Sequence, residues 1–286
     1  MPAAFAMTIT DSTPVAYLGP EGSFSHLVAR TRFGEARELV PRPSVDEVFD
    51  YLEGEPETVA IVPIENSSGG IITATVDRIL RDDSPFFILE EIALNVKLAL
   101  LGRENEAVTK IYSHFAPFHH CEKWLKAHYP RAEQIVAPST SNAVIFASQE
   151  PGAAAIGPRD SAERYGLSVL HYPIAAEVPN ITQFFVVAHS PNASAPENAR
   201  TSLAVVLPDS SGSLFRFLEP FAKSAVNLKR IESRPIAGQP NKYRFFVELD
   251  GNHADPKVEQ ALEMARAVSL RIRNLGSYPA SARFES

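Results

Sequence analysis

The sequence predicts a two-lobed α/β domain followed by a smaller α+β domain with the ferredoxin-like βαββαβ plan. Apolar, strand-like segments alternate with amphipathic, helix-like segments up to about residue 190, which favours an α/β sheet. A stretch rich in Pro, Asn, Ala and Ser then indicates a linker, and beyond it the order of elements changes. We therefore expect a first domain at 14–190, a linker at 191–200 and a second domain at 201–280.

The elements of the first domain follow from apolar periodicity and helix caps. Ser23 and Ser44 are typical N-caps, and Glu47 completes a capping box with Ser44. The apolar run at 86–101 is long enough for two strands or for one strand that crosses between lobes. The pattern predicts a mostly parallel sheet, with strands at 15–19, 38–43, 59–64, 134–138, 153–157 and 183–190, and helices at 23–33, 44–54, 73–81, 118–129, 139–148 and 161–166.

The second domain shows the order strand, helix, two strands, helix and a short final strand. These elements are expected at 201–208, 211–225, 228–235, 243–251, 255–276 and 277–279. The first helix contains an internal proline, and the last helix is the longest in the chain. The order of elements is that of a ferredoxin-like domain of about eighty residues.

Composition excludes several classes of function. The net charge of −7 and a pI near 5.7 argue against a nucleic-acid surface, because binding would require a basic stripe. The one cysteine, Cys121, has no partner for an internal disulfide and is expected to be a buried structural thiol in a reducing compartment. The N-terminus does not resemble a signal peptide, and the apolar run at 86–101 is too short and too charged to span a bilayer. We expect a soluble cytoplasmic protein with no nucleic-acid or membrane partner.

Polar side chains follow three of the predicted strands at the points where those strands end. They form the stretches GPEGSFS (19–25), PIENSS (63–68) and PSTSN (138–142). The carboxyl ends of parallel strands meet at one edge of a sheet, so these residues are expected to face a shared crevice. Helix N-termini and hydroxyls bind anions, and the pattern therefore predicts a site for a small anionic molecule. The histidines lack the spacing of a metal site, and no metal is expected.

Several long motifs resemble, in the right order, those of prephenate dehydratases followed by an ACT regulatory domain. They are YLGPEGSFSHLVA, VPIENSSGG, IYSHFAPFHHCEKWL, STSNA, AAIGPRDSAERYGLSVL and NITQFFVV, then GSLFRFLEPFAKSAVNLKRIESRP, KYRFFVELDG and LGSYP. The resemblance runs from about Val15 to Pro279. It implies two lobes similar to periplasmic binding proteins with the site between them, and conversion of prephenate to phenylpyruvate, carbon dioxide and water. It implies no metal or organic cofactor.

The resemblance also assigns residues to roles. It places the essential threonine of the family at Thr182, as donor to the leaving hydroxyl, and it adds Glu65 and Ser23 to the catalytic set. The implied substrate contacts are Ser25, Asn66, Ser67, His114, Ser139, Thr140, Asn180, Gln183 and Phe184. Two departures stand out: Gln183 replaces the family arginine, and Phe115 and Ala116 replace a Pro-Gln pair.

The ACT resemblance implies phenylalanine as an inhibitory effector bound between two such domains. The implied effector residues are Gly212, Ser213, Leu214, Asn227, Leu228, Glu232, Ser233, Arg234 and Pro235. An open sheet edge in a ferredoxin-like domain favours pairing, so we expect a homodimer or a dimer of dimers. Three alternatives remain open: decarboxylation of prephenate without loss of water, a non-catalytic amino-acid sensor, and a side activity such as hydrolysis of a small lactone or ester.

Overall fold

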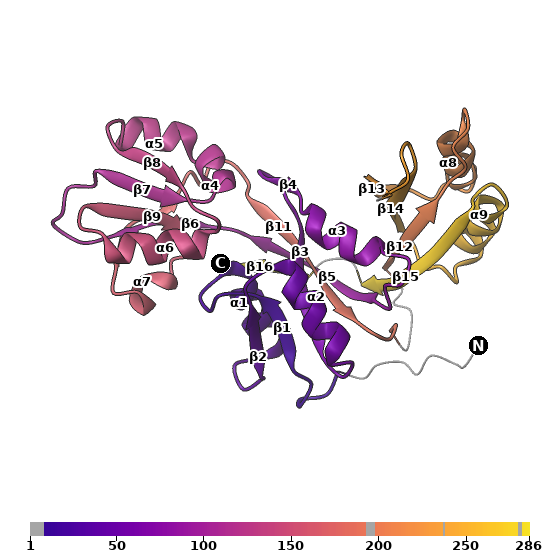
Figure 1. The fold of residues 1–286 in the computed structure, drawn as a ribbon, viewed down its shortest axis with the longest axis horizontal. Coiled ribbons are helices and arrows are strands. Elements are labelled where there is room, and N and C mark those ends of the chain that lie inside the picture. Colours follow the sequence, from indigo (N-terminus) through magenta and orange to yellow (C-terminus); the bar gives the residue numbers. More distant parts are fainter. Residues whose placement is uncertain (1–8, 193–197, 237, 280–281) are drawn as a thin grey trace.

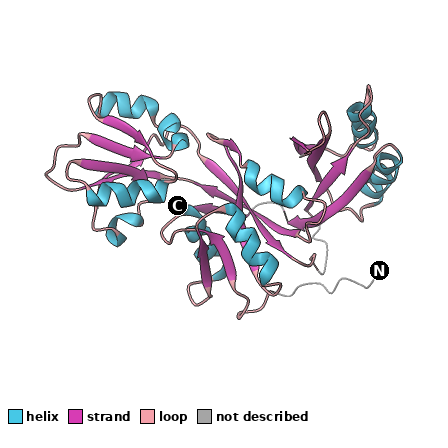
Figure 2. Ribbon diagram, viewed as in Figure 1, coloured by secondary structure: helices cyan, strands magenta, loops and turns pink. Residues whose placement is uncertain are grey.

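The computed structural model describes residues 9–192, 198–236, 238–279 and 282–286, which form three sheets with their helices. Two sheets make a pair of lobes joined by a hinge, and the third packs against the first lobe on the side away from the second (Figure 1). Helices flank each sheet (Figure 2). No helix within the described ranges has the length and apolar character needed to cross a membrane.

The first lobe is a seven-stranded sheet in the order β16-β5-β11-β3-β1-β2, with β4 paired to β3. Its elements are β1 (Val15–Leu18), α1 (Phe24–Phe33), β2 (Leu39–Arg42), α2 (Val45–Gly54), β3 (Val59–Asn66), β4 (Gly70–Ile71), α3 (Thr73–Leu80), β5 (Phe87–Asn95), β11 (Ile181–Ala188) and β16 (Ala282–Glu285). The expected caps are present: the Ser23 hydroxyl accepts from the His26 N–H at 3.2 Å, and the Ser44 hydroxyl accepts from the Glu47 N–H at 3.2 Å.

The second lobe is a five-stranded sheet in the order β10-β6-β9-β7-β8. Its elements are β6 (Leu98–Gly102), β7 (Lys110–Ser113), α4 (Phe115–His120), α5 (Glu122–His128), β8 (Glu133–Val136), α6 (Thr140–Gln149), β9 (Ala153–Gly157), α7 (Ser161–Arg164) and β10 (Ser168–Ile174). The apolar run at 86–101 thus supplies one strand to each lobe and crosses the hinge between β5 and β6. The chain returns between β10 and β11, and the two crossings meet where the Val96 N–H donates to the Asn180 carbonyl at 2.7 Å.

The expectation of a mostly parallel sheet is wrong, because both lobe sheets are mixed. In the first lobe, β11 lies between β3 and β5 and runs antiparallel to both. In the second, β6 runs antiparallel to its neighbours β10 and β9. The cause is the double crossing of the hinge, which sends strands back through the middle of each sheet in the opposite direction.

The third unit has the expected βαββαβ order, with the sheet β13-β14-β12-β15. Its elements are β12 (Ala199–Val206), α8 (Ser213–Lys223), β13 (Leu228–Pro235), β14 (Tyr243–Asp250), α9 (Pro256–Ala267) and β15 (Arg271–Pro279). The expected linker falls partly on 193–197, outside the described residues. The expected long helix at 255–276 is wrong beyond Ala267, since 271–279 form a nine-residue strand paired antiparallel to β12. Pairing across the sheet outweighs the weak local helical pattern there.

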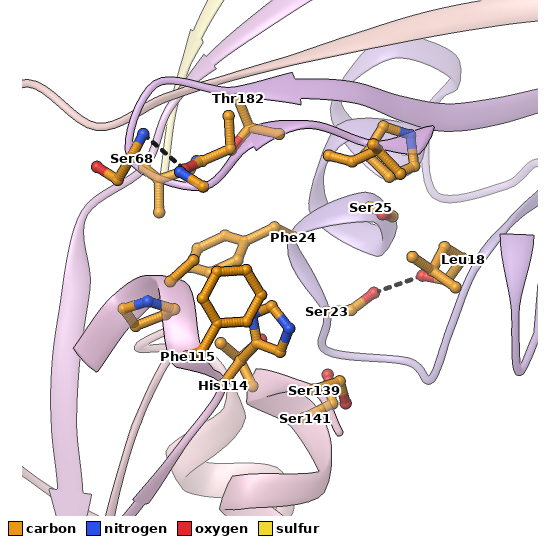
Figure 3. A pocket seen from close by; sticks show the side chains of 18 of the residues that line it. Leu18, Ser23, Phe24, Ser25, Ser68, His114, Phe115, Ser139, Ser141 and Thr182 are labelled. Atoms are coloured by element: carbon orange, nitrogen blue, oxygen red, sulfur yellow. Dashed lines mark hydrogen bonds between the residues drawn. The ribbon is translucent and has the colours of Figure 1, made fainter. Parts of the chain in front are cut away.

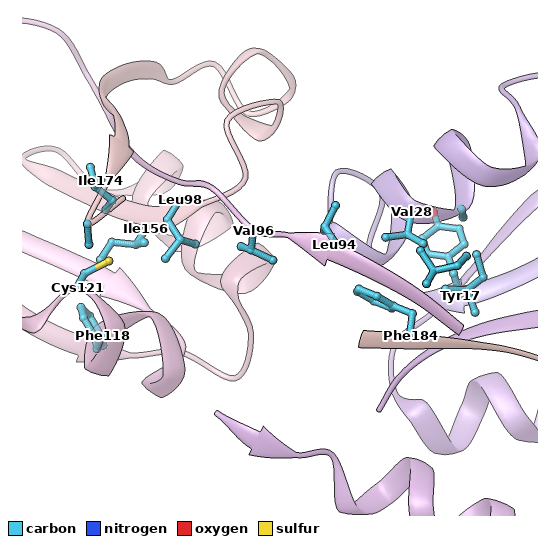
Figure 4. Close-up of a cluster of buried hydrophobic side chains, with 14 of the residues drawn as sticks. Tyr17, Val28, Leu94, Val96, Leu98, Phe118, Cys121, Ile156, Ile174 and Phe184 are labelled. Atoms are coloured by element: carbon cyan, nitrogen blue, oxygen red, sulfur yellow. The ribbon is translucent and has the colours of Figure 1, made fainter. Parts of the chain in front are cut away.

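Two apolar clusters tie the units together. One crosses the hinge through Leu94, Val96 and Leu98 and joins the cores of the two lobes (Figure 4). The other joins the first lobe to the third sheet, whose Phe246 and Tyr278 rings lie 6.0 and 5.8 Å from the Phe185 ring. The third sheet therefore has helices α8 and α9 on one face and the first lobe on the other.

Candidate active site

A cavity of about 460 Å³ opens between the two lobes at the hinge. Its lining comes from the start of α1, the β3–β4 turn and β11 in the first lobe, and from the starts of α4 and α6 in the second. Figure 3 shows Thr182 and Ser68 on one side of it and Ser139 and Ser141 facing them from the other lobe. The size suits a ligand of drug-like dimensions.

Hydrogen bonds fix the orientation of the Asn66 amide at the end of β3. Its Oδ1 accepts from the backbone N–H groups of Ser68 (2.9 Å) and Gly69 (2.8 Å). Its Nδ2 therefore carries both amide hydrogens, and these go to Asn180 Oδ1 (2.9 Å) and Thr182 Oγ1 (2.8 Å). Because Thr182 accepts from Asn66, the hydroxyl proton of Thr182 is left to donate elsewhere, and Thr182 lines the cavity.

Two helices begin at the cavity, one from each lobe. Ser23 caps α1 and also donates its hydroxyl proton to the Leu18 carbonyl at 3.0 Å. Ser139 caps α6, accepting from the Asn142 N–H at 3.0 Å. The first N–H groups of a helix have no partner within the helix, and the helix dipole adds positive potential there. The two starts form an uncharged but electropositive wall for an anion.

Aromatic side chains narrow the middle of the cavity. Phe24 and Phe115 both line it, and Figure 3 shows them between the polar groups of the two lobes. His114 packs against Phe115, with 4.3 Å between the ring centroids. Burial lowers the pKa of His114, which keeps its imidazole neutral at pH 7. Among the described residues that line the cavity there is no Lys, Arg, Asp or Glu.

Most of the residues expected from the sequence line this cavity, namely Ser23, Ser25, Asn66, His114, Ser139, Thr140, Asn180, Thr182 and Phe184. Three do not. The Ser67 hydroxyl accepts from the Ile181 N–H at 2.9 Å, and the side chains of Glu65 and Gln183 both accept from Arg230 in the third unit. A direct contact of Glu65 or Gln183 with a ligand in the cavity does not fit this placement.

Four further residues line the cavity to which the sequence analysis assigned no role: Phe24, Ser68, Phe115 and Ser141. Ser68 lies 3.0 Å from His120 Nδ1, and His120 Nε2 lies 3.2 Å from the Ala175 carbonyl. The carbonyl requires a proton on Nε2, so Nδ1 accepts from the Ser68 hydroxyl and links the two lobes. Ser68 is visible in the sequence as the second serine of PIENSS, but no local pattern predicts its contact with His120, which lies 52 residues further along the chain.

The residues expected to bind an effector lie at the start of α8, just before β13 and on β13 of the third unit. Gly212 precedes α8 with φ of 77°, and an added Cβ would lie 3.1 Å from Arg216 Nη1. Asn227 Nδ2 donates to Asp250 at 3.0 Å, while the Ser233 side chain is exposed. Arg234 forms two hydrogen bonds to Asp77 of the first lobe, at 2.6 and 2.7 Å.

Comparisons with known proteins match this chain to relatives over most of its length. The family model for prephenate dehydratase matches residues 15–192, and the model for the ACT domain matches residues 201–263. A bifunctional chorismate mutase/prephenate dehydratase of Stutzerimonas stutzeri is 35% identical over 268 residues, covering 93% of this chain and 73% of the relative. A prephenate dehydratase of Bacillus subtilis is 31% identical over 279 residues, covering 92% and 98%.

A solved structure is similar over the same span. The prephenate dehydratase of Arthrobacter aurescens in complex with L-Phe superposes with a TM-score of 0.82 and is 31% identical, covering 93% of this chain and 90% of that one. That relative therefore shares both the two-lobed architecture and the third, ferredoxin-like unit with this chain.

Proposed function

The chain belongs to the prephenate dehydratase family, and we propose that its cavity converts prephenate to phenylpyruvate, carbon dioxide and water, with Thr182 as the donor to the leaving hydroxyl. The observation that carries this role is the fixed direction of the Asn66–Thr182 hydrogen bond. Asn66 can only donate in that bond, so the Thr182 proton is available to a ligand.

The reaction needs little from the protein beyond orientation and one hydrogen-bond donor. The bond from the ring to its carboxylate breaks and its electrons enter the ring, while the bond to the hydroxyl on the opposite ring carbon breaks. One proton is taken up so that the hydroxyl leaves as water, and the ring becomes aromatic. Thr182 donates a hydrogen bond to the departing oxygen, and the proton that completes the water molecule comes from solvent. Help of this kind is typically worth about 10²–10⁴-fold in rate.

The two carboxylates of prephenate are proposed to bind at the starts of α1 and α6. The free N–H groups at the two helix starts and the hydroxyls of Ser25 and Thr140 supply donors on opposite sides of the cavity, while the Ser139 hydroxyl donates to Asn142 Oδ1 at 2.7 Å. Phe24 and Phe115 contact the ring. Because residues of both lobes line the cavity, the substrate contacts both of them.

The test is turnover of prephenate, followed by the absorbance of phenylpyruvate in base and by mass analysis of the products. Thr182→Ala is expected to lower kcat by about 10²-fold or more, with the thermal midpoint almost unchanged, and Thr182→Ser should retain part of the activity. Formation of a decarboxylated product that keeps the hydroxyl, or a Thr182→Ala enzyme within a few-fold of wild type, contradicts the proposed role.

Phenylalanine is the proposed effector, bound at α8 and β13 of the ACT domain. The relative from Arthrobacter aurescens binds L-Phe, and Gly212 here permits close approach of a backbone to a ligand. We expect Gly212→Ala to raise the phenylalanine concentration needed for half inhibition by about 10-fold or more, about 1.4 kcal/mol in binding, because an added Cβ would lie 3.1 Å from Arg216 Nη1. Gly238→Ala is the matched control, since Gly238 has φ of 73° in the same domain and open space around it. Equal inhibition of both variants would place the effector elsewhere.

The proposed assembly is a homodimer or a dimer of dimers. The strand β13 is an edge of the third sheet, and Ile231 on it is 44% exposed. Pairing of two such edges would cover it. Light scattering that shows a monomer at micromolar concentration, with inhibition by phenylalanine preserved, contradicts this assembly. The cytoplasm is the proposed location, supported by the free, buried Cys121.

A further inference from the structure

Strand β11 separates the cavity from the ACT domain, and its two faces serve different neighbours. Thr182 and Phe184 line the cavity. Gln183 and Phe185 point the other way, where Phe185 packs against Phe246 and Tyr278 of the ACT domain. A strand alternates its side chains between two faces, so residues next to each other on β11 contact the substrate site and the regulatory domain in turn.

At the end of β3 a β-bulge likewise directs neighbouring side chains to opposite faces of the sheet, one toward the ACT domain and one toward the cavity. The pairing of β11 with β3 shifts between Gln183 and Phe184, whose partners are Glu65 and Pro63, so that Ile64 has no partner in the register. Beyond the bulge Glu65 pairs with Gln183, and Asn66 pairs with Thr182. The first pair faces the ACT domain and the second faces the cavity. Bulges re-aim side chains in this way next to functional sites.

Arg230 on β13 contacts both members of the pair that faces the ACT domain. Its Nε donates to Glu65 Oε2 at 2.9 Å, and its Nη2 donates to Gln183 Oε1. Its Nη1 donates to Glu248 Oε2 at 2.6 Å, and Glu248 is held in turn by Arg200 at 3.0 Å. The Arg230 side chain is only 10% exposed. The Arg230 guanidinium therefore bridges β3 and β11 on the face of the sheet opposite the cavity, and its hydrogen bond to Glu248 holds it within the ACT domain.

Attachment of the ACT domain to the first lobe does not by itself explain the contacts that Arg230 makes. The ACT domain also reaches the first lobe through Arg234 to Asp77 and through Arg244 to Asp82, both on the side of α3. Neither pair involves β3 or β11. Arg230 is buried against the Glu65–Gln183 cross-strand pair, which lies next to the Asn66–Thr182 pair, and burial of a guanidinium is costly unless its partners are fixed.

We propose that Arg230 is a positioning residue that clamps Glu65 on β3 to Gln183 on β11 and so holds the Asn66–Thr182 hydrogen bond in its reactive geometry. Arg230 lies two residues before Glu232 on the same strand, so a ligand at the effector residues acts on the clamp through β13. The proposal rests on the proposed role of Thr182 in the dehydratase reaction and adds the element by which the ACT domain reaches that residue.

The experiment compares Arg230→Met with Arg230→Lys and with the matched control Arg244→Met. Loss of the clamp is expected to lower kcat by about 10- to 100-fold, because misplacement of a catalytic group by about 1 Å has effects of this size. The KM for prephenate should change much less, since Arg230 does not line the cavity. Arg230→Lys should recover part of kcat, and inhibition by phenylalanine should be lost in Arg230→Met. Arg244→Met should keep kcat and inhibition close to wild type.

Gln183→Met tests the same clamp from the other side, where Arg230 keeps Glu65 and Glu248 as partners. If Arg230 acts through Gln183, the effects of Arg230→Met and Gln183→Met on kcat are not additive in the double variant. This variant also keeps the proposal testable if Arg230→Met does not fold. Wild-type kcat and full inhibition in either single variant, or simple additivity in the double variant, overturn the proposal.

Hydrogen exchange separates this proposal from the proposed function. Amides at 65–67 and 181–183 should exchange faster in Arg230→Met or Gln183→Met than in wild type, whereas Arg244→Met should not change them. This readout needs no turnover. If wild type failed to convert prephenate but the exchange followed this pattern, the role of Thr182 would fall and the clamp would stand. Unchanged exchange in an active enzyme would remove the clamp alone.

Discussion

Asn66→Asp is the sharpest test of the proton direction at Thr182. The two side chains have almost the same shape, but aspartate has no amide hydrogens. Its Oδ1 would still accept from the Ser68 and Gly69 N–H groups, which lie 2.9 and 2.8 Å from Asn66 Oδ1. Its second oxygen would stand where Nδ2 now donates to Thr182 at 2.8 Å. Thr182 would then donate to the carboxylate instead of the substrate.

The expected magnitude follows from the bonds that change. Redirecting the Thr182 proton removes a donor whose help is worth about 10²–10⁴-fold, so kcat should fall at least about 10²-fold. Asn180 Oδ1, which accepts from Asn66 at 2.9 Å, would face a second acceptor, at a cost of about 1–3 kcal/mol in stability. Steady-state turnover of prephenate and thermal unfolding measure the two effects. As the pH falls and the new carboxyl group gains a proton, kcat should partly recover.

Two comparisons make the result decisive. Asn105→Asp changes the same chemistry on an exposed loop and should leave kcat unchanged. Thr182→Ala should lower kcat no further when it is combined with Asn66→Asp, because both changes remove one donor. An Asn66→Asp enzyme with kcat within a few-fold of wild type, or one whose activity rises with pH, would refute the assigned direction of the bond.

Three further outcomes are expected. Burial and the nearby Glu91 raise the pKa of Glu248 from 4.5 to about 7 despite Arg230 and Arg200. Between these two pKa values the folded state binds more protons than the unfolded state, so the free energy of unfolding should fall as the pH rises from about 5 to 7. Urea titrations of Glu248→Gln should show a weaker dependence of that free energy on pH. Gln183→Arg should leave the KM for prephenate within about 2-fold of wild type, because the new charge would face the carboxylates next to Arg230 rather than the cavity; a clear fall in KM would show a substrate contact. The KM of the wild type should also change less than about 2-fold between low salt and about 0.2 M salt, since no ionised side chain lines the described cavity, and a steep rise would reveal a charge there.

The sequence predicted the parts of the fold that depend on local signals. Caps at Ser23 and Ser44 begin helices as expected, and the polar strand ends do meet at one cavity. The expectation of a helix through 276 was wrong, because the alternation of apolar and charged residues at 270–273 fits the period of a strand, and 271–279 pair with β12. The direction of the strands likewise depends on the double crossing of the hinge, which no local pattern records.

The site shows the same division between local and distant signals. Period-two alternation along NITQFF places Thr182 and Phe184 on one face and Gln183 on the other, so the sequence held the information that the family comparison overrode. The partner of Gln183 could not be found in this way, because Arg230 lies 47 residues further along the chain and 165 residues beyond Glu65. Contacts at such separations follow from how domains pack.

The uncharged lining of the cavity suits the chemistry that we propose for it. The ring carboxylate of prephenate is an anion in the ground state and leaves as neutral carbon dioxide. A buried arginine paired with it would stabilise the ground state more than the transition state and slow the reaction. Neutral donors at the starts of α1 and α6 are roughly half as strong as charged ones, so they orient the carboxylate at a smaller cost to its departure. Arg230 carries its charge on the opposite face of β11, where it can hold the strand that presents Thr182 without stabilising the group that must leave.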